Sequence, residues 1–328
     1  MDYSAIYSGD AAAATPEPWR TALSPTGASI AFPAFDTGCT ITAYGEPAAM
    51  QEALQAARDA CREFEGLFSR TLPTSDIGRL NRARGAAVEV DPRTFGLLQA
   101  ACGYCAASEG AFDITVGALS DLWDFKEGRI PSPEVRTQAA AHVGWQGLEL
   151  QRDDAGRCLA RLADGDARVD LGGIAKGWIA DELGGALMQA GARGAVLNLG
   201  GNVLVRGSKP DGSPWRVALR HPAGRWPSAA PTVTLEEGSV VTSGTYERSF
   251  MRDGVCYHHI LDPKTGMPVP CEAVSASVVA ERSIDAEGYS TTLLALGPKR
   301  ARGFLRRHPE IIQAVFILQD GIVLPVTS

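Results

Sequence analysis

The sequence predicts an α+β fold in which antiparallel or mixed sheets are flanked by helices. Segments with strand and helix periodicity do not alternate in the regular rhythm of a parallel, doubly wound sheet. Residues 146–169 instead look like a hairpin with its turn at 153–156. The last part of the chain combines one helix, at 285–296, with three strand-like segments. These segments lie at 274–280, 312–318 and 321–326.

The first third of the chain contains a β-rich stretch followed by helices. Residues 28–45 are strand-like, and a helical pattern follows from about 46 to 69. Apolar side chains recur there every three or four positions and form one stripe: Met50, Leu54, Ala57, Cys61, Phe64 and Phe68. A short helix is expected after Ser75, its N-cap, and a longer one from Asp91-Pro92 to about Ala107. Phe95, Leu98 and Cys102 lie on one face of the longer helix.

The middle of the chain carries weaker signals. Residues 126–145 are polar and are expected to be helical. Residues 169–171 are expected to end a strand, followed by a glycine turn and a helix from Ile174. Strands are expected at 195–199 and 202–207, and Pro/Gly-rich loops occupy about 207–230.

Composition and charge exclude several classes of protein. The 328 residues are 45% hydrophobic, enough for a sizeable core in one unit of two fused lobes. A net charge of -7 argues against a nucleic-acid surface, because neutralising phosphates requires clustered Lys and Arg. No segment is long and apolar enough to span a bilayer.

The N-terminus and the cysteines bear on the compartment. Residues 1–20 are Ala- and Pro-rich and read as a flexible tail, which leaves 21–328 as one domain. The tail lacks a basic start followed by an apolar run, so a cytoplasmic protein is expected. Seven cysteines, an odd number in a large chain, favour a reducing compartment. Cys102 and Cys105 form a C-x-x-C pair without a second ligand pair at zinc-like spacing, so packing is the preferred interpretation.

The first segment with a chemical signature is VDLGGIAKGWIADEL, residues 169–183. A Gly-rich turn into a helix presents free backbone N–H groups to an anion, and Lys176 adds a positive charge in the first turn. Asp170 could hydrogen-bond a ribose or an amide. The pattern is neither G-x-G-x-x-G nor a P-loop, and the glycines could simply turn a strand tightly into a helix.

The second segment combines a polar turn with a histidine pair. Thr242, Ser243 and Gly244 are expected to form a turn after a strand, able to hold phosphate oxygens. His258 and His259 close a later strand, where adjacent side chains face opposite ways, so only one is expected to face a site. A histidine near neutral pKa can take a proton from a hydroxyl. A structural hairpin remains the alternative, and no G-x-S-x-G elbow supports a serine hydrolase.

The third segment, residues 284–297, is expected to be helical. Glu287 and Thr291 are then four apart and share a face. A carboxylate and a hydroxyl at this spacing suit a hard cation such as Mg²⁺. The pair could equally be a solvated surface pair, and Asp285 could cap the helix or bind the metal instead.

Seven segments together resemble the ApbE family of FAD:protein FMN transferases. They occur in the family's order and spacing, and the resemblance spans about residues 30–320. The segments are SDIGRLN (75–81), GAFDITVGALSDLWDF (110–125), DLGGIAKGWIADE (170–182), NLGGNVLVRG (198–207), TSGTYERSF (242–250), YHHILDPKTGMP (257–268) and AEGYSTTLLALG (286–297).

The resemblance implies a two-lobed fold related to the T-fold and a role for each matching residue. FAD would be the donor, Mg²⁺ the metal, and another protein's Thr or Ser hydroxyl the acceptor, with release of AMP. His259 would activate that hydroxyl, and Gly173, Glu287 and Thr291 would surround Mg²⁺. The residues expected along FAD are Ala111, Phe112, Asp113, Asp170, Lys176, Thr242, Ser243, Gly244 and His258.

Three positions depart from the family pattern. Glu287 stands where members usually have Asp, and Thr37-Gly38-Cys39 stands where Met-Gly-Thr is common. Thr71 occupies the place of an aromatic residue expected to touch the flavin or its adenosine. Two alternative functions follow: a Mg²⁺-dependent FAD pyrophosphatase that yields FMN and AMP, or an FAD-binding protein without turnover.

Overall fold

The computed structural model describes residues 20–220 and 230–328. The predicted N-terminal tail, apart from Arg20, lies outside these residues, as does the stretch 221–229 of the predicted long loop.

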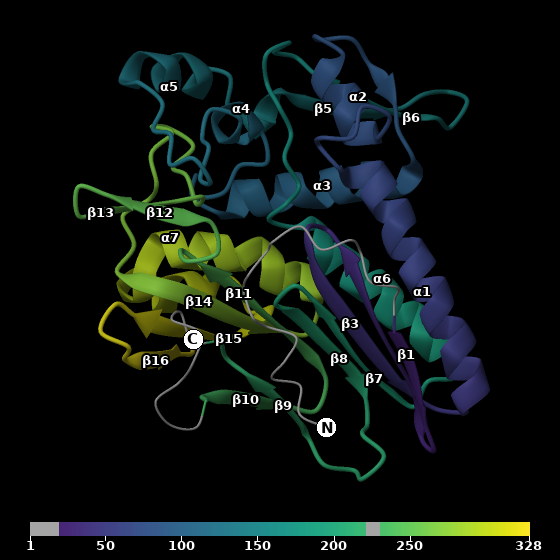
Figure 1. The fold of residues 1–328 in the computed structure, drawn as a ribbon. Helices are drawn as coiled ribbons and strands as arrows, with labels where there is room; N and C mark the ends of the chain where they lie inside the picture. The colour runs from purple at the N-terminus through teal and green to yellow at the C-terminus, as the bar shows by residue number, and fades with distance from the viewer. Residues whose placement is uncertain (1–19, 221–229) are drawn as a thin grey trace.

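An antiparallel sheet forms the base of the larger lobe (Figure 1), and its strand order is β1-β2-β3-β7-β8-β11-β14-β15-β16. Every neighbouring pair in it is antiparallel, which confirms the predicted fold class. The strands are β1 (Arg20–Ser24), β2 (Gly27–Ala34), β3 (Thr37–Tyr44), β7 (Gly194–Leu199), β8 (Asn202–Gly207), β11 (Gly238–Gly244), β14 (Ala273–Ala280), β15 (Ile311–Leu318) and β16 (Val323–Val326).

Three helices cover one face of this sheet: α1 (Pro47–Phe68), α6 (Ala175–Gln189) and α7 (Ser283–Arg307). Alternate strand residues face opposite sides of a sheet. Val241 and Val278 accordingly belong to the main core under the helices, whereas Val240 and Val279 pack in a second cluster. That second cluster includes residues of a small ribbon formed by β9 (Trp215–Ala218) and β10 (Thr232–Leu235).

The small lobe, residues 70–168, lies beyond one end of the main sheet (Figure 1). It contains a three-stranded sheet in the order β4-β6-β5. Its elements are α2 (Asp76–Arg82), β4 (Val88–Glu89), α3 (Pro92–Ala107), α4 (Gly117–Ser120), α5 (Pro133–Ala140), the 3₁₀ turn η2 (Trp145–Gly147), β5 (Leu148–Arg152) and β6 (Cys158–Leu162). A separate hairpin of β12 (Ser249–Arg252) and β13 (Val255–His258) leads into the histidine pair.

The strongest local patterns are confirmed. All six residues of the predicted apolar stripe on α1 are buried. Ser75 caps α2 by accepting a hydrogen bond from Gly78 N at 2.8 Å. The helix predicted to end at Leu296 continues as α7, but Gly297 has φ 72° and Pro298 follows, so the helix is kinked where the prediction ends.

Four local expectations are wrong. Residues 169–171 form no strand, because Arg168 makes only an isolated bridge with Val116. Residues 242–244 belong to β11 rather than to a turn after it. Only part of 126–145 is helical, since α5 spans eight residues. The expected loop 207–230 contains the strand β9. Its partner strand, β10, follows the end of that loop in the sequence.

Helices α6 and α7 meet closely where the site is built. Gly177 leaves no room for a side chain, because a Cβ there would lie 2.7 Å from Ser283 O and 3.0 Å from Glu287 Cβ. The Asp181 carboxylate of α6 accepts hydrogen bonds from the N–H groups of Ser283 and Ile284, both at 2.9 Å. A side chain of one helix therefore caps the other.

Among the described residues, none of the helices is both long enough and apolar enough to cross a membrane.

Candidate active site

The glycine turn before α6 is held by its own polar groups. Asp170 Oδ1 accepts a hydrogen bond from Gly172 N at 2.9 Å. The Lys176 ammonium donates to Gly172 O at 3.3 Å. The N-cap residue Ile174 contributes no capping side chain. Leu171 O accepts hydrogen bonds from the N–H groups of Ile174 and Ala175, at 3.0 and 2.9 Å, so within the described part of the chain only the next N–H groups, of Lys176 and Gly177, are left for an anionic ligand.

A buried ion pair links this turn to α7. Lys176 Nζ lies 2.8 Å from Glu287 Oε1, and Glu287 is only 4% exposed. Asn202 of β8 donates from Nδ2 to the other carboxylate oxygen, Oε2, at 3.0 Å. Burial alone would lower the pKa of Lys176, but the charge and hydrogen bond of Glu287 raise it. Each oxygen of this buried carboxylate therefore has a polar partner, and the Lys176 ammonium stays charged.

Hydroxyl groups continue the polar cluster along α7. Ser243 of β11 lies with its Oγ 2.8 Å from Ser290 Oγ and 3.1 Å from Thr291 Oγ1. Glu287 and Thr291 share a helix face, as predicted, but Glu287 is buried, so the pair is not a solvated surface pair.

This donor set fits a hard divalent cation. Glu287 and Thr291 offer oxygen atoms, and Gly173 follows in the chain directly after Gly172, whose carbonyl Lys176 contacts. An ammonium group already balances the buried carboxylate, which shows that the position favours a cation.

Asp285 lies on a different face of α7 from Glu287. Its carboxylate accepts a hydrogen bond from the Tyr104 hydroxyl of α3, at 2.5 Å. Asp285 neither caps the helix, a role that Asp181 performs, nor contacts the cluster around Lys176 among the described residues.

The segment 111–113 approaches the same turn from the small lobe. The Phe112 ring packs on Gly173, where a Cβ would lie 3.0 Å from the ring. Ala111 is partly exposed beside it. The Asp113 carboxylate instead accepts hydrogen bonds from the backbone N–H groups of Thr115 (2.8 Å) and Trp145 (3.1 Å), so it stabilises the backbone of the small lobe.

The residues 242–244 are divided between the two faces of the sheet. Ser243 faces α7, whereas Thr242 faces the other way and its Oγ1 lies 2.7 Å from Ser277 Oγ. Gly244 allows the Tyr246 ring to pack on the strand, because a Cβ there would lie 2.7 Å from that ring. The structure thus brings Ser243, but not the Thr242 side chain, to the Lys176–Glu287 cluster.

The two histidines have different surroundings. His258 is buried, and desolvation lowers its pKa. Burial and the nearby positive charges of Arg248 and Lys176 lower the pKa of His259 to about 4. Nδ1 of each histidine is buried without a hydrogen-bond partner among the described residues. The His259 ring is therefore neutral near pH 7 and lies close enough to Lys176 to be affected by its charge.

Two residues of this site were missed by sequence reasoning. Asn202 lies within one of the seven matching segments, but a single amide gives no local signal of its carboxylate partner. Arg70 forms ion pairs with Asp170 at 3.2 Å and with Asp121 at 2.5 Å. Neither contact could be deduced from sequence spacing.

The C-x-x-C pair packs as expected. Burial raises the thiol pKa of both Cys102 and Cys105. Both cysteines are free thiols. A raised pKa disfavours the thiolate that redox or metal chemistry needs.

The comparisons with known proteins agree on one family. A model described as the ApbE family matches residues 35–316. The FAD:protein FMN transferase of Treponema pallidum is 34% identical over 302 residues, which cover 87% of this chain and 82% of that relative. The FAD:protein FMN transferase of Salmonella typhimurium is 32% identical over 279 residues, covering 84% and 78%.

Solved structures have the same fold. The ApbE protein of Thermotoga maritima gives a TM-score of 0.81 at 29% identity and covers 91% of this chain and 96% of its own. The flavinyl transferase ApbE of Pseudomonas stutzeri, in its apo form, gives 0.78 at 27% identity, covering 95% and 96%.

Proposed function

Because this chain belongs to the ApbE family, we propose that it transfers FMN from FAD to a Thr or Ser hydroxyl of an acceptor protein and releases AMP. It is an FAD:protein FMN transferase like its relatives. We also propose that the reaction uses Mg²⁺ and the site residues described above, and that the acceptor group is a Thr or Ser hydroxyl.

One observation carries the proposal: a buried carboxylate, Glu287, lies between Lys176 and Asn202 beside an uncapped helix N-terminus. Such a site offers N–H donors and an ammonium to phosphate oxygens, and oxygen ligands to a metal. Phosphoryl transfer depends mainly on positioning and on stabilising charge, which are the contributions that this cluster can make.

The donor would bind across the glycine turn. The N–H groups of Lys176 and Gly177 and the ammonium of Lys176 would bind its pyrophosphate, with Ser243 and Gly244 of β11 beside it. Phe112, packed on Gly173, and Asp170 would line the rest of the donor. Thr242 would contribute through its backbone, because its side chain faces the other side of the sheet.

Glu287, Thr291 and the carbonyl of Gly173 would hold Mg²⁺. When bound, Mg²⁺ supplies neutralisation of the pyrophosphate and of the charge that develops on the leaving AMP. Glu287 has the oxygen ligands of the Asp common in the family, and Asn202 orients it from the second carboxylate oxygen.

His259 would act on the acceptor. Its neutral ring would take the proton of the Thr or Ser hydroxyl while that oxygen attacks the FMN phosphorus. The bond from this phosphorus to the bridging oxygen breaks, and AMP leaves with that oxygen. The acceptor then carries FMN through a phosphoester. His258, buried beside it, would support the ring rather than contact the hydroxyl.

The test is mass spectrometry of a Thr-containing acceptor peptide incubated with the protein, FAD and Mg²⁺. Transfer predicts an FMN-sized mass gain on the peptide together with release of AMP. An Ala-for-Thr peptide is the matched control and should stay unmodified. FMN and AMP without a modified peptide would indicate a pyrophosphatase, and intact FAD throughout would indicate a binding protein.

A further inference from the structure

Arg248 lies directly opposite His259 across the β12–β13 hairpin. The His259 N–H donates to Arg248 O at 3.0 Å, which extends the strand pairing one step beyond Ser249 and His258. Side chains of directly opposite residues lie on the same face of an antiparallel pair, about 5 Å apart at Cβ. The Arg248 side chain therefore leaves the backbone beside the ring that would take the acceptor's proton.

The next pairs of the hairpin agree with this placement. Phe250 and Tyr257 are two positions further along, on the same face as Arg248 and His259, and their ring centroids are 5.3 Å apart in a stacked arrangement. His258 lies between these two pairs and faces the other side of the hairpin. Of the two histidines, only His259 shares a face with Arg248.

The charge of Arg248 reaches the candidate active site. Burial and the positive charge of Arg248 are the two main causes that lower the pKa of His259. Lys176 also lies within reach of this charge. A cation beside the base weakens its hold on a proton, which by itself would slow catalysis. The arrangement becomes favourable when an anion binds beside these groups.

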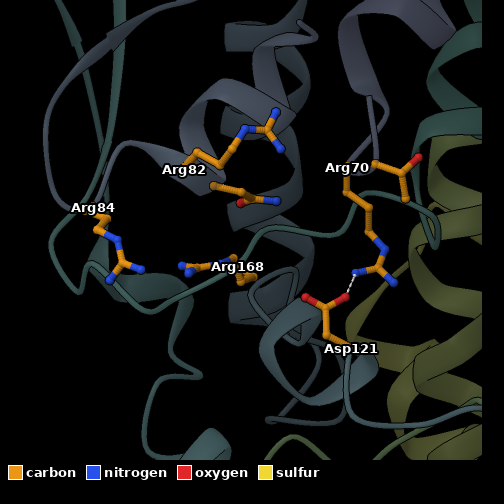
Figure 2. A pocket seen from close by; sticks show the side chains of 7 residues that line it. Arg70, Arg82, Arg84, Asp121 and Arg168 are labelled. Atoms are coloured by element: carbon orange, nitrogen blue, oxygen red, sulfur yellow. Dashed lines mark hydrogen bonds and ion pairs between the residues drawn. The ribbon is translucent and has the colours of Figure 1, made fainter. Parts of the chain in front are cut away.

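The Arg248 guanidinium is available to such an anion. It is exposed, and among the residues that the structure describes no side chain or carbonyl accepts a hydrogen bond from it. Two arginines of the small lobe are by contrast already engaged. Arg70 pairs with Asp121, as Figure 2 shows, and Arg168 donates to two backbone carbonyls at 3.0 and 2.7 Å.

The chemistry of the transfer places the phosphorus beside Arg248 and His259. A base must lie within hydrogen-bonding reach of the hydroxyl whose proton it takes. That hydroxyl oxygen must in turn approach the phosphorus to about 3–3.5 Å. A phosphoryl group attacked by a hydroxyl held on His259 therefore lies next to the ring, where the Arg248 side chain also lies. Arginine matches phosphate oxygens with paired, planar N–H donors.

Building on the proposed FMN transfer, we propose that Arg248 is a further catalytic residue, which binds the non-bridging oxygens of the phosphoryl group that passes from FAD to the acceptor. The acceptor oxygen forms a bond to this phosphorus while the bond from phosphorus to the bridging oxygen breaks. The hydroxyl proton goes to His259, and AMP leaves with the bridging oxygen. Arg248 stays protonated and stabilises the charge on the non-bridging oxygens by hydrogen bonding.

The test is the rate of FMN transfer to the Thr-containing peptide at saturating FAD, measured as a function of pH. Well above the acid limb, R248Q should transfer at least about 100-fold more slowly than the wild type, the usual cost of removing one transition-state donor. FAD affinity, measured by flavin fluorescence, should change by less than about threefold, because the contact strengthens only in the transition state. R252Q is the matched control and should transfer like the wild type. Arg252 lies on the same face of β12, nearer the turn and over the Phe250 ring.

A second variant separates contact with the phosphoryl group from an effect through His259. R248K keeps the positive charge but loses the paired donors. Its acid limb should therefore coincide with that of the wild type, while transfer stays at least about tenfold slower. Methylguanidinium added to R248A should restore part of the rate. If R248Q transfers at the wild-type rate above the acid limb and only the limb moves, Arg248 acts solely through His259 and the proposal is overturned.

Product analysis distinguishes failure of this proposal from failure of the proposed function. FMN and AMP with an unmodified peptide would show that the wild type uses water instead of a protein hydroxyl, but the same phosphorus is attacked. R248Q should then slow FAD hydrolysis by the same factor of about 100. Hydrolysis or transfer at the wild-type rate in R248Q would overturn the role of Arg248 alone. Intact FAD with the wild type would overturn both.

Discussion

The ammonium group of Lys176 lies 2.8 Å from the carboxylate of Glu287, joining the first turn of α6 to the first turns of α7. The Glu287 carboxylate is nearly inaccessible to solvent, so it needs a positive partner at all times. The same two residues are those proposed for the donor pyrophosphate and for Mg²⁺. The stability of this region and its chemistry should therefore depend on the same charges.

Replacing Glu287 with Gln should abolish metal binding and slow FMN transfer by about 100-fold or more, since a metal contributes several kcal/mol of charge stabilisation. Calorimetric titration with Mg²⁺ and the mass-spectrometric transfer assay measure the two effects. Glu272→Gln is the matched control, because Glu272 is exposed and pairs only with Lys299 among the described residues. Unchanged metal binding and activity in Glu287→Gln would remove Glu287 from the metal site.

Replacing Lys176 with Met should lower the free energy of unfolding by about 3 kcal/mol in the absence of metal, because the buried Glu287 loses its partner. Urea denaturation in the presence of a chelator measures this loss. Adding the Glu287→Gln change should recover part of the stability, since the uncompensated charge is removed. Two strictly additive losses would show that the ion pair contributes no coupling.

Replacing His259 with Ala should leave FAD affinity nearly unchanged and slow transfer by about 100-fold or more, the usual contribution of a general base. Flavin fluorescence measures binding, and mass spectrometry of the acceptor measures transfer. His142→Ala in the small lobe serves as the control, since His142 pairs with Asp164 away from the cluster. Full transfer by His259→Ala would remove His259 from the mechanism.

The pH dependence follows from the pKa of His259, which burial and the charges of Arg248 and Lys176 lower to about 4. Above that pH the ring is neutral and able to accept a proton, so transfer should fall only as pH drops through about 4. In the unfolded protein the ring has a pKa of about 6.5, so the unfolded state takes up a proton at a higher pH than the folded state does. His259 therefore lowers the free energy of unfolding as pH falls from about 6.5 to about 4.

The variant Arg248→Gln isolates the electrostatic part of this pKa. Removing a positive charge near His259 should raise its pKa and move the acid limb of the transfer profile to higher pH. Profiles of transfer rate against pH at saturating FAD measure the shift. An acid limb that stays in place would mean that a different group titrates.

Replacing Gly177 with Ala should destabilise the protein by about 1–3 kcal/mol, because the new Cβ would collide with the backbone of α7. Gly185 is the matched control in the same helix, since a Cβ there meets nothing within 4 Å. Gly185→Ala should be neutral or stabilising by up to about 1 kcal/mol, through helix propensity. Urea denaturation distinguishes the two, and equal effects would contradict the close packing of α6 on α7.

Elements governed by local chemistry were predictable from the sequence. The stripe on α1 repeats with the helix period, and Ser75 caps α2 through the adjacent backbone. The kink at Gly297-Pro298 is also local. By contrast, 242–244 were expected to form a turn but lie in β11, because pairing with β14 overrides their small, polar composition.

The sequence by itself determined the α+β class with antiparallel or mixed sheets, the main helices and the family, because periodicity, caps and ordered motifs depend on residues close together in the chain. Only the tertiary structure decided that Glu287 is buried against Lys176 and Asn202, and that Asp285 turns to Tyr104. Only the fold also gathers Arg70, Arg82, Arg84 and Arg168 around one cavity. These contacts join residues such as Asn202 and Glu287, 85 positions apart. The packing of α6, α7 and the small lobe determines which residues meet, and a local sequence pattern does not predict this packing.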